Sequence, residues 1–97
     1  MITATTEGFA LSGDMTFLQA KLWLAKGKES FASHKGNLVS LDLSAMCKLD
    51  SSALAIIFGW MRALQKEGKT LALKSPPQDL LSLGQMYGIS DILPIGS

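Results

Sequence analysis

Residues 41–61 read LDLSAMCKLDSSALAIIFGWM, and this stretch decides the fold. It continues a nearly unbroken apolar run over residues 38–43, which predicts a β-strand covered on both faces. Asp50 and Ser51 then supply helix-starting side chains, and a strongly apolar helix follows at once. The helix should run to about Lys66, because a glutamate and a glycine come next. A strand that leads directly into a long apolar helix indicates an α/β fold.

The chain before this stretch predicts a hairpin and one helix. Residues 2–6 and 8–12 are short, β-branched or alternating and flank a Glu-Gly turn, so they predict a β-hairpin. Thr16 and Gln19 have the spacing of a capping box, which predicts a helix start at that point. We expect this first helix to fray near Gly27 or shortly after.

The chain after the central stretch predicts one more strand and one more helix. Residues 70–74 form a short strand, and two prolines then exclude both helix and sheet. Residues 78–86 predict a third helix, and residues 89–95 a short edge piece or turn. The order is β-β-α-β-α-β-α, which indicates a mixed, mostly parallel sheet flanked by helices, with an antiparallel hairpin at one side. We expect a single domain over 1–97.

Helical spacing predicts which faces of the first two helices are buried. In the first helix the predicted buried stripes are Leu18, Leu22 and Ala25 and the adjoining Phe17, Leu24 and Phe31. In the second helix the predicted sheet-facing stripe is Leu54, Ile57, Phe58, Met61 and Leu64. A second stripe of Ile56, Trp60 and Ala63 is either covered by another element or forms an exposed patch for a partner. Sequence alone leaves both interpretations open.

The composition excludes several classes of function. The chain has 97 residues, of which 47% are hydrophobic and 18% charged, and its net charge of +1 predicts neither disorder nor nucleic-acid binding. The only histidine, His34, lies in a polar loop and is interpreted as an ordinary surface residue. One histidine and one cysteine cannot build a zinc site or a nucleophilic triad. The Gly-Lys pair within residues 25–30 lacks the rest of a phosphate loop. We therefore expect no enzyme, no catalytic residue, no metal and no cofactor.

Cysteine usage and hydropathy indicate the compartment. Cys47 is the only cysteine, which excludes an internal disulfide and favours a reducing compartment. We interpret Cys47 as a small hydrophobic filler in an apolar loop. The first residues lack the basic start and long apolar run of a secretory signal, and the longest apolar run, 53–60, is too short to span a membrane. The predicted location is the cytoplasm, with membrane contact only through a partner.

Ser51 has two interpretations. It lies at or next to the helix N-cap, where its hydroxyl can accept from a free backbone N–H. A phosphate on the same hydroxyl would be favoured by the helix dipole. Because serine and aspartate precede many helices, the capping interpretation is the simpler one.

The segment LDLSAMCKLDSSALAII closely resembles the signature of the STAS domain family, in which a strand with Asp precedes a D-S/T-x-G-L helix start. The resemblance covers nearly the whole chain. Within the family, the later segment is most similar to the MlaB-type STAS subunit of the Mla phospholipid-transport ABC complex. The matching positions are Pro76 or Pro77, Leu80, Leu83, Tyr87, Gly88, Leu93 and Pro94.

The resemblance implies a site and two roles. Ser51 occupies the place of the phosphorylatable residue of anti-sigma-factor antagonists and of a partner-contacting residue in the transport subunit, and Asp50 precedes it as the family requires. Ala53 stands where the motif usually has glycine, and we interpret its methyl group as narrowing the approach of a kinase or a partner backbone. The predicted partner interface at the second helix consists of Asp50, Ser52, Ile56 and Trp60, with Ser51 as a further contact or phosphorylation site.

The first implied role is a non-enzymatic subunit that binds and regulates the ATPase of an Mla-type ABC system. Such a subunit is cytoplasmic, or peripheral to the inner membrane through the transporter complex. The alternative is an anti-sigma-factor antagonist switched by phosphorylation of Ser51, whose partners are an anti-sigma factor and serine kinase.

Overall fold

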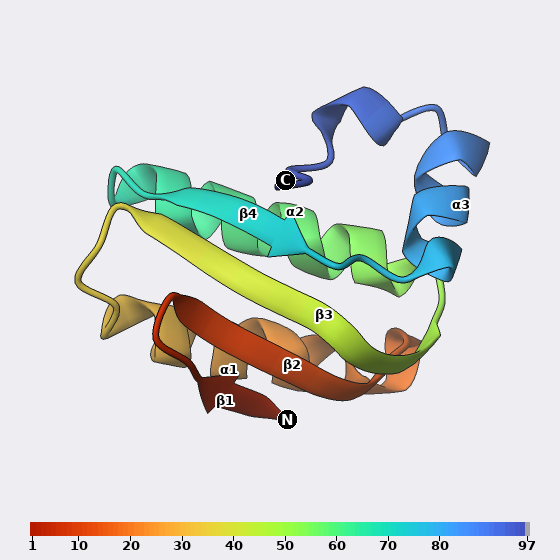
Figure 1. The fold of residues 1–97 in the computed structure, drawn as a ribbon. Helices are drawn as coiled ribbons and strands as arrows, with labels where there is room; N and C mark the ends of the chain where they lie inside the picture. Colours follow the sequence, from red (N-terminus) through yellow and green to blue (C-terminus); the bar gives the residue numbers. More distant parts are fainter. Residues whose placement is uncertain (97) are drawn as a thin grey trace.

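The computed structural model describes residues 1–96, and its centre is one four-stranded sheet with the order β1-β2-β3-β4 (Figure 1). The strands are β1 (Ile2–Ala4), β2 (Gly8–Met15), β3 (Leu38–Leu49) and β4 (Thr70–Lys74). β1 runs antiparallel to β2, whereas β2, β3 and β4 are parallel neighbours. The predicted mixed α/β sheet and its N-terminal hairpin are therefore confirmed.

Three α-helices and two short 3-10 helices complete the fold. They are η1 (Phe17–Gln19), α1 (Ala20–Ala32), α2 (Ser52–Lys66), α3 (Gln78–Met86) and η2 (Ser90–Ile92). The capping box at Thr16 is present, and the bounds of α3 match the prediction. After η2, Ile95 forms a parallel bridge with Leu73 of β4, which confirms the predicted edge piece.

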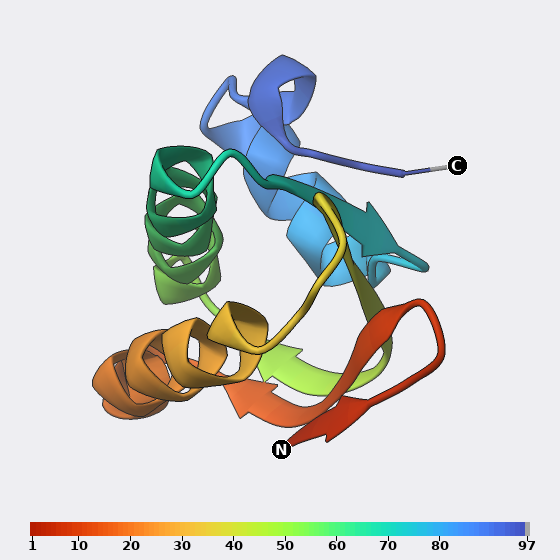
Figure 2. The same cartoon turned by 90° about the vertical axis from the view of Figure 1, so that its left-hand side faces the viewer.

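The core lies between the sheet and the two crossover helices. α1 connects β2 to β3 and α2 connects β3 to β4, and both helices lie on the same face of the sheet (Figure 2). Val39, Leu41 and Leu43 of β3 point into this core, and all three are buried. The alternate residues Asp42 and Ser44 lie on the opposite face. The predicted cover on both faces of β3 is thus wrong, because successive right-handed crossovers between adjacent strands place both helices on one side.

The buried face of α1 differs from the predicted one. Its buried residues are Trp23, Gly27 and Phe31, which follow one another at a spacing of four. Leu18 and Leu22 of the predicted stripe are 88% and 57% exposed. The helix does not fray at Gly27 but continues to Ala32. The reason is that Gly27 is the point where α1 crosses α2, since a Cβ atom there would lie 2.2 Å from Nε1 of Trp60.

The outer stripe of α2 is covered by α1, so the predicted exposed patch is wrong. Ile56 and Trp60 are both 0% exposed. The Trp60 ring packs edge-on against Phe31, with 5.2 Å between ring centroids, and against Trp23 at 6.3 Å. Of the stripe predicted to face the sheet, Leu54, Ile57 and Leu64 are buried, whereas Phe58 and Met61 are only half-buried. Ile56 and Trp60 therefore cannot line a free surface.

Replacement of Gly27 by alanine should destabilise the protein, because the added methyl group would collide with the indole of Trp60. Alanine favours a helix by about 1 kcal/mol over glycine. Overpacking against a rigid ring should outweigh that gain and leave a net loss of about 1–3 kcal/mol. Urea unfolding measures this loss of stability. Gly68→Ala cannot serve as a control, because Gly68 has a φ of +72°, where any residue with a Cβ is strained. The control is Ala25→Gly at an exposed site of the same helix, which measures the difference in helix propensity between alanine and glycine without a change in packing.

Candidate functional site

The two junctions that lead into α1 and α2 lie side by side at one end of the sheet (Figure 1). β3 runs beyond its predicted end at residue 43 and pairs with β2 as far as Met15 and Leu49. This pairing continues past two register shifts, at each of which β3 contains one residue more than β2. The backbone N–H of Lys48 donates to Oδ1 of Asp14 at 3.1 Å, which further joins the strand ends. Residues far apart in sequence therefore share one surface.

Asp50 connects the starts of the two helices. Its Oδ2 accepts from the backbone N–H of Phe17 at 3.0 Å, and its Oδ1 accepts from the N–H of Ser52 at 2.8 Å. The hydrogen bond from Phe17 is the main reason why the pKa of the Asp50 carboxyl lies below its ordinary value of 3.8, although desolvation opposes the shift. The ionised carboxylate thus fixes η1 against the N-terminus of α2.

The Asp50→Asn variant should be less stable by about 1 kcal/mol at neutral pH, because it loses a charge-assisted acceptor at a helix start. The lowered pKa of Asp50 means that its contribution is present above pH 3.8 and fades as the pH falls through the folded-state value. Thermal melts of both proteins from pH 7 to pH 2.5 should therefore converge at the acid end. A stability difference that stays constant with pH would contradict this role of the charge.

Ser51 is the N-cap residue of α2, but its hydroxyl does not cap the helix. The side chain makes no capping hydrogen bond, and the residue is exposed. The Asp50 carboxylate takes the Ser52 N–H instead, which leaves the Ser51 hydroxyl available to a partner or a modifying enzyme. The simple capping interpretation of Ser51 is therefore wrong, whereas Asp50 has a local bonding role that the sequence suggested.

Ala53 does not obstruct this surface. The residue is 0% exposed and packs in the core with Leu43, Ile57 and Leu80 of α3. A methyl group that points into the core cannot narrow the approach of another protein, so that interpretation of Ala53 is wrong.

Two large apolar side chains lie exposed beside the serine. Phe17 is 76% exposed and Leu18 is 88% exposed, and the backbone of Phe17 is bonded directly to Asp50. We refer to Phe17, Leu18, Ser51 and Ser52 as the junction surface. Sequence reasoning missed the first two because helical spacing assigned them to a buried stripe. Large exposed apolar residues next to one another are typical of a protein–protein contact.

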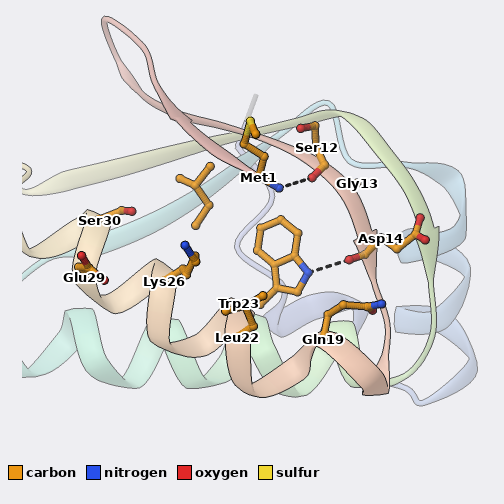
Figure 3. Close-up of a pocket in the computed structure, with 11 residues that line it drawn as sticks. Met1, Ser12, Gly13, Asp14, Gln19, Leu22, Trp23, Lys26, Glu29 and Ser30 are labelled. Atoms are coloured by element: carbon orange, nitrogen blue, oxygen red, sulfur yellow. Dashed lines mark hydrogen bonds between the residues drawn. The ribbon is translucent and has the colours of Figure 1, made fainter.

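A groove of about 540 Å³ runs along α1 (Figure 3). It lies between α1 and the first two strands, and Gln19 and Leu22 line its wall nearest the junction surface. Trp23 lines the groove as well, and its Nε1 donates to the backbone oxygen of Asp14 at 2.7 Å.

The remaining candidate residues lie elsewhere. A ring nitrogen of His34, Nε2, is 2.9 Å from the oxygen of Leu38, and the half-buried ring lies 5.9 Å from that of Phe9. Cys47 is exposed on β3, so its interpretation as a hydrophobic filler in a loop is wrong. Within residues 1–96, no group of three or more His, Cys, Asp and Glu side chains could hold a metal ion. None of the helices in this range combines the length and apolarity needed to cross a bilayer.

A family model and a curated relative of this chain both carry the name MlaB. A family model described as "Mlab, STAS domain" matches residues 3–94. The chain is 37% identical over 54 residues to the "Intermembrane phospholipid transport system binding protein MlaB" of Haemophilus influenzae. That match covers 56% of this chain and 51% of the relative, so the chain spans about half the length of the protein it matches.

Solved structures show the same fold. The unphosphorylated anti-sigma factor antagonist SpoIIAA superimposes with a TM-score of 0.73 at 16% identity, over 100% of this chain and 87% of SpoIIAA. An antagonist-like protein from Thermotoga maritima gives a TM-score of 0.66 at 22% identity, over 92% of this chain and 80% of that one. At these identities the likeness concerns the fold alone.

Proposed function

Because this chain belongs to the STAS family described as Mlab, STAS domain, we propose that it is a non-enzymatic subunit that binds and regulates the ATPase of a phospholipid-transporting ABC system. The observation that carries the proposal is the junction surface, where Phe17 and Leu18 are exposed and the exposed Ser51 side chain makes no capping hydrogen bond. The name of the Haemophilus influenzae relative supports phospholipid transport as the process. In this role the chain works in the cytoplasm and reaches the inner membrane only through the complex.

The geometry of the junction surface favours binding over catalysis. Asp50 uses both carboxylate oxygens to hold the backbone of two helices, and the lowered pKa of its carboxyl makes it a weak general base for Ser51. The result is a rigid surface that presents apolar side chains and one hydroxyl. A preorganised surface of this kind loses little entropy when a partner binds.

The alternative role is that of an anti-sigma-factor antagonist switched by phosphorylation of Ser51, with an anti-sigma factor and serine kinase as partners. The observation that favours it is the exposed hydroxyl at the N-terminus of a 15-residue helix. A phosphate there would be stabilised by the helix dipole and repelled by the neighbouring Asp50 carboxylate.

Mass spectrometry of the protein from its native cells separates the two roles. The transport role predicts no substantial phosphate on Ser51 under any growth condition. It also predicts that Ser51→Ala binds the purified ATPase subunit within about tenfold of wild type, because a single exposed hydroxyl contributes about 0.5–1.5 kcal/mol. Stoichiometric phosphate on Ser51, together with capture of a serine kinase that Ser51→Asp abolishes, would favour the antagonist role instead.

A further inference from the structure

A second groove separates the outer surfaces of α1 and α2. It has a volume of about 630 Å³, and it is distinct from the groove beside the first strands. Leu24 from α1 and Ala63 from α2 contribute to its apolar wall. We refer to it as the α1–α2 groove. About 11 residues of α2 separate Ser51 from Arg62 in this groove, which at 1.5 Å per residue is about 16 Å.

Cationic side chains flank both sides of the α1–α2 groove. Lys28 lines it from α1, and Arg62 and Lys66, one helical turn apart, line it from α2. All three are exposed, and within residues 1–96 none of them forms a salt bridge. Glu67 is the one acidic residue of the lining, and its carboxylate lies 4.0 Å from Nζ of Lys69.

The guanidinium group of Arg62 lies next to the apolar wall of the groove. A guanidinium nitrogen of Arg62 lies 4.0 Å from the point where a Cβ of Gly59 would be, so the side chain folds back along α2. Leu24 approaches the same glycine from α1, at 2.7 Å from that point. The cation therefore lies close to the apolar wall formed where the two helices meet.

We propose that the α1–α2 groove binds an acidic, amphipathic segment of the ATPase subunit, which gives the complex a second contact in addition to the junction surface. This inference rests on the proposed function. The charge is complementary, because three cations and one acid line the groove. An amphipathic segment suits the arrangement, since its apolar stripe can contact the recessed wall while acidic residues on either side meet Lys28, Arg62 and Lys66. A flat membrane surface could reach only the rim.

The test measures the affinity of the full chain for the purified ATPase subunit as a function of salt. The double variant Arg62→Glu and Lys66→Glu should bind at least about tenfold more weakly at low salt and should lose most of the salt dependence. The matched control, Lys35→Glu with Asn37→Glu and Gln85→Glu, makes the same change of charge at exposed sites outside both grooves and should bind within about threefold of wild type.

Cross-linking locates the segment directly. A benzophenone attached at Ala63→Cys in a Cys47→Ser background should cross-link to a peptide of the ATPase subunit that is rich in Asp and Glu. Equal binding by wild type and the groove variant would overturn the inference and leave the proposed function standing. Failure of wild type to bind the ATPase subunit would overturn both. Binding of the chain to anionic phospholipid vesicles that the Arg62 and Lys66 changes abolish would show that the groove serves a lipid surface, which also overturns the inference.

Discussion

The Trp60→Ala variant should lose about 3–5 kcal/mol of folding free energy, the range for removing a large aromatic side chain from a core. Trp60 is 0% exposed and contacts the rings of Phe31 and Trp23, so its removal leaves a cavity between α1 and α2. Because a domain of this size has a total stability of only about 5–15 kcal/mol, the variant should melt far below wild type or fail to fold.

Two further variants test whether the loss of stability comes from the missing volume of the Trp60 ring. Trp60→Phe should cost less than Trp60→Ala, because it retains most of the volume and removes a buried indole N–H that has no partner in residues 1–96. Leu22→Ala, at a 57% exposed site of α1, should change stability by less than about 1 kcal/mol. A Trp60→Ala protein that melts like wild type would show that the ring lies outside the core.

The Leu18→Asp variant should weaken binding to the ATPase subunit by about a hundredfold or more while leaving the melting temperature unchanged. Leu18 is 88% exposed, so its replacement removes almost no core packing. In the complex the same position would place a carboxylate in an apolar contact, and loss of a hot-spot side chain alone costs about 2 kcal/mol or more. Calorimetric titration measures the affinity, and circular dichroism checks the fold.

Ile92→Asp provides a matched control for this experiment. Ile92 is a large apolar residue that is 58% exposed in η2, away from the junction surface (Figures 1 and 2). The control carries the same added charge and should bind the ATPase subunit like wild type. If Ile92→Asp abolishes binding and Leu18→Asp does not, the contact surface lies at α3 and η2 and the junction surface is the wrong site.

Local sequence signals were sufficient to predict the elements and their order. The two prolines and the glycine around α3, and the Asp-Ser pair before α2, act within a few residues and identify these helices correctly. The buried faces depend on packing between distant segments, which periodicity alone does not specify. Across η1 and α1 both Leu18-Leu22 and Trp23-Gly27-Phe31 have helical spacing, and the close crossing over Gly27 selects the second set.

The candidate site was predictable only in part for the same reason. Asp50 and Ser51 are adjacent in sequence, and their place at the start of α2 follows from local rules. The contribution of Phe17 depends on a hydrogen bond across 33 residues of sequence, and no local pattern predicts it. Ile56 and Trp60 were assigned to a partner because the sequence does not reveal that α1 covers them.

A single titration measures whether the junction surface binds the ATPase subunit. Wild-type chain is titrated into the purified ATPase subunit of the native phospholipid-transporting ABC system, in parallel with folded Leu18→Asp. We expect saturable, stoichiometric binding by wild type and a loss of about a hundredfold or more in affinity for the variant. Absence of binding by wild type, or equal affinity of the two proteins, would contradict this expectation.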